Sequence, residues 1–300
     1  MLKIALSPVY SHPLPDGHRF PMEKYSLLPQ QLLYEGTVEE SNFFLPSPAE
    51  SAWILATHDA DYLDKLRHLS LSKAEIRAIG FPLSAPLITR EICIAGGSVQ
   101  AAHFAKEFGI GMNIAGGTHH AFYARGEGFC LLNDLAITAN QLLESGLAKK
   151  VLIVDLDVHQ GNGTASLFEG STSVITFSMH GEKNYPHRKE KSHLDIGLPD
   201  GTGDTVYLDL LERHLQDLLA QELPDFMLYQ SGVDVLATDQ LGRLSLSHAG
   251  VYARDKLVLS LAKSMGVPIM CCMGGGYSKQ IKDIVEAHAQ VFRLAQDLYF

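Results

Sequence analysis

The run from Asp155 to His159 carries three side chains that could hold a metal ion. Asp155, Asp157 and His159 alternate along the chain, so on an extended backbone their side chains share one face. Two carboxylates and an imidazole buried together without a partner carry a large desolvation cost, which a divalent cation relieves. A hydrogen-bonded polar cluster without metal is the alternative, and this run alone does not decide between the two.

Three other apolar runs also end in residues that could do chemistry. Asp234 follows Phe226–Gln230, Tyr277 follows Val267–Met273 and a glycine turn, and His119 and His120 follow Gly111–Ala115 and a pair of glycines. Each segment alone could be packing or surface decoration. Ligands bind beyond the carboxyl ends of parallel strands, so four such strand ends together predict one catalytic site at that edge of a sheet.

These segments resemble the signature blocks of the zinc-dependent histone deacetylases, in the same order and at compatible spacings. The blocks are Gly116-Gly117-x-His119-His120-Ala121, Gly128-Phe129-Cys130-x-x-Asn133-Asp134, Asp155-x-Asp157-x-His159-x-Gly161-x-Gly163 and Gly274-Gly275-Gly276-Tyr277. The resemblance extends from His18-Arg19 to Tyr277. The run from His159 to Gly163 is most similar to the class IV branch and its bacterial relatives. The resemblance implies an arginase-like α/β fold and an enzyme that removes acyl groups from lysine side chains.

The resemblance assigns the metal ligands to Asp157, His159 and Asp234. Three protein ligands leave positions open for water and a substrate carbonyl, as a catalytic zinc site requires. Zn²⁺ is the expected ion, although oxygen-rich ligation also admits Fe²⁺ or Co²⁺.

The same resemblance gives the other catalytic residues their roles. His120 is expected to be the general base and later the acid, with His119 as its electrostatic partner and Asp155 accepting a hydrogen bond from His119. Tyr277 would donate its hydroxyl to the developing oxyanion. Where most of the family has an aspartate partner for His120, this chain has Asn162. An amide can orient the ring but cannot raise its pKa by charge, so we expect a more acidic limb of the pH profile.

Substrate-binding residues also follow from the resemblance. Gly128 and Phe129 resemble the wall of a narrow tunnel that holds an extended acyl-amine chain, although Phe129 could instead be a core aromatic. Gly275 belongs to the same expected substrate site. Arg19 resembles an arginine that lies deep in the pocket of the family. Alternatively, Arg19 could form a salt bridge on the surface.

One further cation site is implied by the family pattern. A potassium ion would lie near Ser178 and the backbone around Asp155, Asp157, His159 and Met179. The sequence does not show which way the backbone carbonyl groups point.

Alternating apolar runs and helical patterns predict one α/β domain over residues 1–300, with a largely parallel central sheet flanked by helices. The expected strands are Lys3–Leu6, Gly111–Ala115, Lys150–Leu156, Val174–Met179, Phe226–Gln230 and Val267–Met273. The expected helices are Met22–Tyr34, Asp59–Leu69, Ile88–Phe108, Leu131–Ser145, Gly203–Glu222, His248–Ser264 and Tyr277 to near the C-terminus. His180–Thr202 is polar and is expected to be a long surface loop.

Composition limits the classes of function. Hydrophobic residues make up 46% of the chain and charged residues 19%, which suits a large buried core. The formal net charge of −10 disfavours direct nucleic-acid binding and suits a cationic substrate. No membrane span or secretory signal is recognisable, so a cytoplasmic location is expected, or a nuclear one in a eukaryote. The four cysteines form no C-x-x-C pair, which argues against a thiolate metal site. The sequence gives no oligomeric state.

Three other functions remain open at this point. An arginase-like hydrolase would need two Mn²⁺ ions and more carboxylate ligands, and would not need Tyr277. A catalytically silent reader of acyl-lysine would be expected to lack that tyrosine. A deacylase of acetylated polyamines or other small amines keeps the same chemistry and changes only the substrate.

Overall fold

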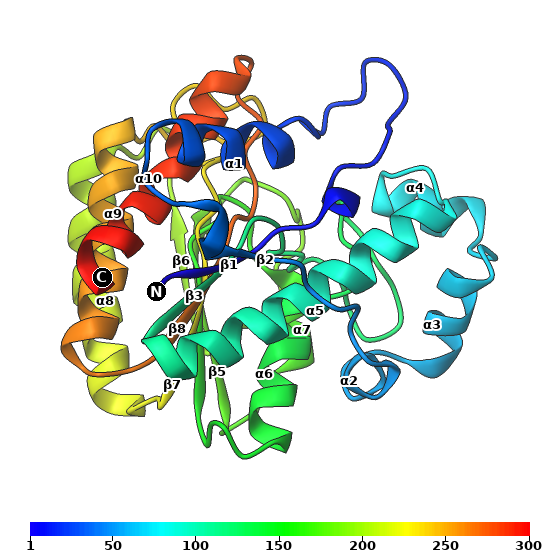
Figure 1. The fold of residues 1–300 in the computed structure, drawn as a ribbon, viewed down its shortest axis with the longest axis horizontal. Helices are drawn as coiled ribbons and strands as arrows, with labels where there is room; N and C mark the ends of the chain where they lie inside the picture. Colours follow the sequence, from blue (N-terminus) through cyan, green and yellow to red (C-terminus); the bar gives the residue numbers. More distant parts are fainter.

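A parallel eight-stranded sheet forms the centre of the protein, whose computed structural model describes residues 1–300 (Figure 1). The strand order is β2-β1-β3-β8-β7-β4-β5-β6, and every neighbouring pair is parallel. The strands are β1 (Lys3–Ala5), β2 (Phe43–Phe44), β3 (Ile110–Asn113), β4 (Val151–Asp155), β5 (Val174–Gly181), β6 (Leu194–Leu198), β7 (Phe226–Gln230) and β8 (Ile269–Cys272). The four central strands β3, β8, β7 and β4 are buried along their whole length, which explains their nearly continuous apolar sequences.

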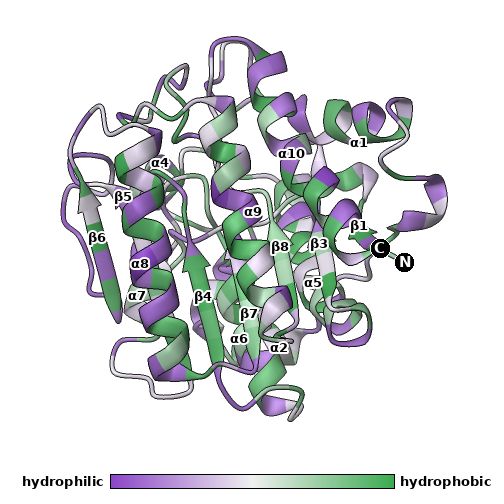
Figure 2. Cartoon of the chain, turned by 90° about the vertical axis from the view of Figure 1, so that its left-hand side faces the viewer, coloured by the Kyte–Doolittle hydropathy of each residue, from purple (hydrophilic) through white to green (hydrophobic).

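Helices cover both faces of this sheet. One layer consists of α1 (Lys24–Tyr34), α8 (Asp204–Glu222), α9 (His248–Ser264) and α10 (Ile281–Tyr299). The other layer contains α5 (Ala85–Phe108), α6 (Asp134–Glu144) and the short α7 (Asn162–Leu167). Figure 2 shows the first layer in front of the apolar strands, with hydrophilic residues on the outer side of α8. Three short helices, α2 (Ser51–Leu55), α3 (Ala60–Arg67) and α4 (Lys73–Ile79), form an excursion beside α5 in Figure 1.

Helix α5 packs directly on the sheet because small residues face each other at the contact. A Cβ atom on Gly111 of β3 would lie 2.0 Å from the carbonyl oxygen of Ala101, so no larger residue fits at this crossing. Local signals define the ends of the helix. The Ser84 side chain accepts a hydrogen bond from the Leu87 amide, and Gly109 ends the helix with a φ of 86°. None of the helices combines the length and the apolar character needed to cross a bilayer.

The predicted α/β architecture is confirmed, and two strands were missed. β2 has only two residues, which is too short for a periodic pattern. β6 lies inside the segment His180–Thr202, so the prediction of a surface loop there is wrong in part. β6 is an edge strand that is mostly half-exposed, and its polar residues obscured its strand character. The short helices α2, α4 and α7 were also not predicted.

Candidate active site

Four adjacent central strands deliver the residues of the candidate site to one edge of the sheet. They are His119 and His120 after β3, Tyr277 after β8, Asp234 after β7, and Asp155, Asp157 and His159 at the end of β4 and just beyond it. Because β3, β8, β7 and β4 are consecutive neighbours, their carboxyl ends bring residues far apart in the sequence into contact.

Asp157, His159 and Asp234 form a buried triad in which the possible ligand atoms lie within 4.8 Å of one another. His159 Nδ1 lies 3.1 Å from Asp157 Oδ1 and 3.0 Å from Asp234 Oδ2. Backbone amides orient both carboxylates. The Val158 amide donates to Asp234 Oδ1 at 2.9 Å, and the Gly275 amide donates to Asp157 Oδ2 at 2.7 Å. Each carboxylate therefore turns its other oxygen toward the imidazole.

The electrostatics of the triad favour a cation between its members. Burial alone would lower the pKa of His159, but hydrogen bonds to Asp157 and Asp234 raise it to about 10. Burial and the nearby charge of Asp157 raise the pKa of Asp234 to about 7. A proton is thus held where two carboxylates and a ring nitrogen converge, and a divalent cation can replace it. The donor set of one nitrogen and two carboxylates fits Zn²⁺ and also fits Fe²⁺ or Co²⁺.

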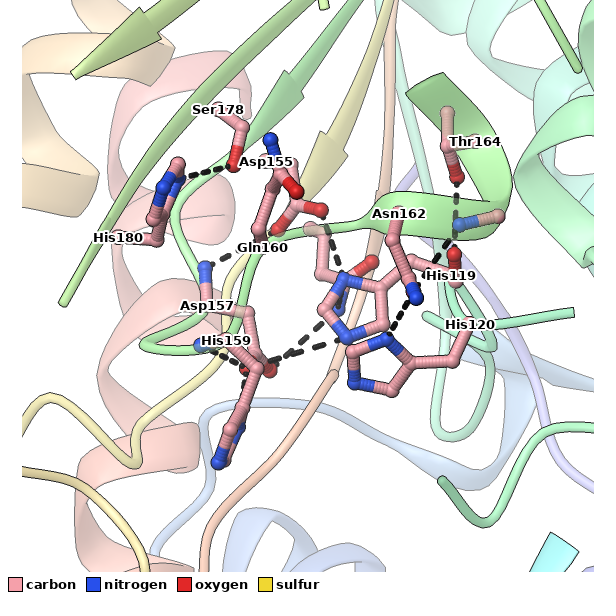
Figure 3. Close-up of polar contacts among 12 residues, drawn as sticks. His119, His120, Asp155, Asp157, His159, Gln160, Asn162, Thr164, Ser178 and His180 are labelled. Carbon is pink, nitrogen blue, oxygen red and sulfur yellow. Dashed lines mark hydrogen bonds and ion pairs between the residues drawn. The ribbon is translucent and has the colours of Figure 1, made fainter. Parts of the chain in front are cut away.

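The paired histidines differ in their hydrogen-bond partners (Figure 3). His119 Nδ1 donates to Asp155 Oδ2 at 2.7 Å, whereas His120 Nδ1 donates to Asn162 Oδ1 at 2.6 Å. Burial alone would lower the pKa of His119, but the charges of Asp155 and others nearby raise it. Burial and the neighbouring charge of His119 hold the pKa of His120 well below its usual range. His120 is therefore the ring that keeps a free lone pair at neutral pH.

Tyr277 is carried by a glycine turn that closes over the carboxylates. A Cβ atom on Gly275 would lie 2.1 Å from Asp234 Oδ2, so only glycine allows this approach. The Tyr277 amide donates to Asp239 Oδ2 at 2.6 Å, which fixes the end of the turn. Burial, followed by the charges of Asp234 and Asp157, raises the pKa of Tyr277 well above its usual value. Its hydroxyl therefore remains protonated and can donate a hydrogen bond.

Lys24 also holds this turn, a role that was not predicted from the sequence. Its side chain is completely buried at the start of α1, and Nζ donates to the Gly274 carbonyl at 3.1 Å. Nζ lies 5.9 Å from the centre of the Tyr277 ring. Burial lowers the pKa of Lys24 to about 8, even though Asp234 and Asp157 act in the opposite direction. A single lysine at a helix start gives no sequence signal that it lies inside the protein.

Aromatic side chains, among them Phe20, Phe129 and Tyr277, line a cavity that leads to Asp157 and His159. The centre of the Phe129 ring lies 5.4 Å from Phe20 and 6.1 Å from Tyr277. Gly128 and Phe129 have φ angles of 56° and 67°, and the Cys130 amide donates to the Glu127 carbonyl at 2.9 Å. This tight turn is strained at Phe129 and directs its ring into the cavity wall. The expected wall residues Gly128, Phe129 and Gly275 all line this cavity.

A second aromatic residue, Tyr185, was not predicted. Its ring stands edge-on to His120 at 5.0 Å between ring centres, and to His159 at 6.5 Å. A Cβ atom on Gly128 would lie 2.7 Å from His120 and 3.2 Å from Tyr185, so this glycine allows the two rings to meet. Tyr185 lies within His180–Thr202, the polar segment expected to be a surface loop.

The structure does not place Arg19 in the cavity. Arg19 is exposed and lines a wide groove formed by residues 11–23, while its neighbour Phe20 takes the inward position. Arg90 of α5 lines the cavity instead, with only 2% of its surface exposed. Its Nε donates to the Tyr10 carbonyl at 2.7 Å, and its guanidinium pairs with Glu91. Arg90 is not predicted from the sequence, because an arginine within an expected helix normally faces solvent.

The residues of the expected potassium site come together on adjacent strands. Asp155 of β4 is in register with Ser178 of β5, and Met179 follows Ser178. Ser178 Oγ also shares a hydrogen bond with His180 Nδ1 at 2.9 Å. The potassium ion itself stays a prediction.

Comparisons with known proteins agree with this geometry. The histone deacetylase domain matches residues 18–292. An uncharacterised protein of Picosynechococcus is 44% identical over 99% of both chains, and histone deacetylase 2 of Arabidopsis thaliana is 28% identical over 89% of this chain and 72% of its own. The structure of a histone deacetylase homologue from Aquifex aeolicus is 25% identical with a TM-score of 0.83, and covers 97% of this chain and 82% of that one. A homologue solved in complex with SAHA is 26% identical with a TM-score of 0.82, over 98% of this chain and 82% of that one.

Proposed function

Because this chain belongs to the histone deacetylase family, we propose that it is a metal-dependent hydrolase that removes acetyl or longer acyl groups from lysine side chains. One observation carries the proposal. Asp157, His159, His120 and Tyr277 line one aromatic-walled cavity, and Asp234 completes the triad through its contact with His159. Amide hydrolysis needs these three components: an electrophile site, a base and an oxyanion donor.

The triad would hold a divalent ion, with Zn²⁺ favoured, whose bound form polarises the amide carbonyl and makes the attacking water more acidic. The Val158 and Gly275 amides keep the carboxylates of Asp234 and Asp157 aimed at that position. The chain supplies three ligands from two loops, so the remaining positions stay free for water and substrate.

The proton transfers are assigned to His120. Its Nδ1 donates a hydrogen bond to Asn162, so Nε2 has the free lone pair that can take the proton from water. The same nitrogen would later return the proton to the departing amine. His119, whose protonated form is favoured by the neighbouring Asp155, would stabilise the negative charge that develops on the substrate. The Tyr277 hydroxyl donates to the same oxyanion. A potassium ion near Ser178 would support the backbone of this loop, as part of the same proposal.

The shape of the cavity and the net charge of the chain support the proposed substrate class. Phe20 and Phe129 form a narrow apolar wall that suits the methylene chain of an acylated lysine. The net charge of −10 favours cationic peptides over nucleic acids. An acylated polyamine also has a methylene chain beside its amide and is also cationic, so it is the second candidate substrate. The presence of Tyr277 beside the triad argues against a silent acyl-lysine reader.

A panel of fluorogenic acyl-lysines, from acetyl to long fatty acyl, run beside acetylated polyamines, tests the proposal. We expect turnover of at least one acyl-lysine, its loss after chelation and its recovery with added Zn²⁺. Turnover of polyamines alone would replace the proposed substrate. Binding of acyl-lysine without turnover by the metal-loaded protein would make the chain a reader and contradict the proposed reaction.

A further inference from the structure

Asn162 connects His120 to a third residue, Glu127, that none of the roles above uses. Asn162 Oδ1 accepts from His120 Nδ1 at 2.6 Å, and Asn162 Nδ2 donates to Glu127 Oε1 at 2.6 Å. The Gly163 amide also donates to Asn162 Oδ1, at 3.1 Å. The amide of Asn162 thus lies between a histidine ring and a carboxylate, with a different atom facing each.

The chemistry of the three groups determines how this chain of hydrogen bonds can run. A carboxylate only accepts, so it requires the NH₂ end of the Asn162 amide. The oxygen end then faces His120, and the ring must place its proton on Nδ1 to complete the hydrogen bond. A neutral imidazole carries one proton, so Nε2 is left with the lone pair that a general base needs.

We propose that Glu127 is a positioning residue that sets the tautomer of His120 by fixing the orientation of the Asn162 amide. The inference rests on the proposed function, in which His120 is the base. An aspartate at position 162 would accept from His120 in either orientation and would need no such partner. An asparagine can also turn its NH₂ end toward the ring and stabilise the inactive tautomer, so its neighbours must select one orientation. The Gly163 amide favours the observed orientation at Oδ1, and Glu127 favours it at Nδ2.

The surrounding structure holds Glu127 in place for this role. Glu127 precedes the strained turn at Gly128 and Phe129, so its backbone is fixed by the same turn that forms the cavity wall. Its side chain is only 18% exposed, and Oε2 faces Arg125 Nε at 3.8 Å. Burial, and then the neighbouring Glu127, raises the pKa of Tyr185, so its hydroxyl stays protonated beside this carboxylate. One oxygen of Glu127 thus accepts from Asn162, and the other faces Arg125.

The direct test reads the tautomer of His120 by long-range ¹H–¹⁵N NMR on zinc-loaded protein labelled at histidine. The His120 signal is identified by its absence in a His120→Gln variant. In the native protein we expect the proton on Nδ1. Glu127→Lys replaces an acceptor with a donor, so Asn162 should turn its oxygen outward and the proton of His120 should move to Nε2. Glu127→Gln can accept or donate, and we expect a mixture of the two tautomers.

Turnover of the best acyl-lysine from the panel provides the second readout. We expect kcat to fall roughly 10²-fold in Glu127→Lys and less in Glu127→Gln, because general-base catalysis contributes about this much. KM and metal content should change little. Glu182→Gln, an exposed carboxylate on the nearby loop, is the matched control and should leave kcat unchanged.

The order of kcat among the residue-127 variants should reverse in the Asn162→Asp background. This reversal would distinguish an effect on the orientation of residue 162 from a general effect of charge at position 127. In that background, residue 162 is a carboxylate that holds His120 in either orientation, but its second oxygen would face residue 127, where a donor is favoured over a second carboxylate. Glu127→Lys should then restore kcat, whereas the unchanged Glu127 should be the worst partner because two carboxylates would face each other. The same order of activity in both backgrounds would overturn the inference.

The two readouts also separate this inference from the proposed function. An inactive native protein with the expected tautomer changes would contradict the deacylase assignment and support the positioning role. An active protein whose His120 keeps its proton on Nδ1 in both the Glu127→Gln and Glu127→Lys variants would overturn the positioning role alone. Glu127→Gln changes neither size nor shape, so a folding failure of Glu127→Lys would still leave a decisive variant.

Discussion

The ammonium group of Lys24 donates to the Gly274 carbonyl at 3.1 Å, across a sequence separation of 250 residues. This contact joins the start of α1 to the turn that carries Tyr277. The Gly275 amide binds Asp157, and the Tyr277 amide binds Asp239. Three successive anchors therefore fix the position from which the tyrosine hydroxyl reaches the substrate.

Replacing Lys24 with methionine should reduce catalysis without removing the metal. Methionine has a similar length and fills the same apolar space, but it leaves the Gly274 carbonyl without its donor. We expect kcat to fall roughly tenfold or more, because small displacements of a catalytic group are costly. Steady-state kinetics and metal analysis measure the two effects. The exposed Lys73→Met is the matched control, and unchanged kcat in Lys24→Met would show that the other two anchors suffice.

Tyr277→Phe should lower kcat by roughly 10² or more, because it removes one hydrogen bond to the oxyanion. The loss should be the same throughout the neutral pH range, since the raised pKa of Tyr277 keeps the native hydroxyl protonated there. Metal content should be unaffected. Near-normal turnover would remove Tyr277 from the reaction and favour the arginase-like alternative.

Metal binding should strengthen as the pH rises. Without metal, the pKa of His159 is raised to about 10, so at neutral pH the ring is protonated and the ion must displace that proton. We therefore expect the apparent affinity to increase by about tenfold per pH unit for each proton released. Competition with a chelating dye at several pH values measures this slope. An affinity that does not change between pH 6 and 8 would contradict the described charge state of the triad.

The acidic limb of kcat/KM should lie at low pH, because burial and His119 keep the pKa of His120 well below its usual range. Asn162→Asp adds a negative charge beside the ring, which favours its protonated form and should move this limb to higher pH. The cleanest comparison uses the Glu127→Gln background, where the new carboxylate does not face a second one. An unshifted or lowered limb would mean that residue 162 does not act on the base.

The sequence predicted the site residues that lie immediately after strands. His119, His120, Asp157, Asp234 and Tyr277 follow apolar runs, and parallel strands bring their carboxyl ends together whatever the details of packing. The sheet and most helices were predicted for the same reason, since buried parallel strands have continuous apolar sequences. The departures from this rule were β2, which has only two residues, and β6, a mostly half-exposed edge strand.

The residues that the sequence analysis missed act through contacts that local patterns do not encode. Lys24, Arg90 and Tyr185 occur in a helix start, a helix and a polar loop, where such residues usually face solvent. Arg19 and Phe20 lie in a bend where Phe20 takes the inward side and Arg19 is exposed, and no local pattern shows which of the two neighbours is buried. Glu127 lies 35 residues from Asn162, and only the fold shows that their side chains meet.

Titration of metal-free protein with Zn²⁺, followed by acyl-lysine turnover, tests the central claim most directly. The triad of Asp157, His159 and Asp234 predicts that activity rises linearly and reaches a plateau at one equivalent of metal per chain. Asp234→Ala should show neither stoichiometric binding nor turnover. A plateau at two equivalents, turnover that is independent of metal, or full metal occupancy in Asp234→Ala would contradict the account.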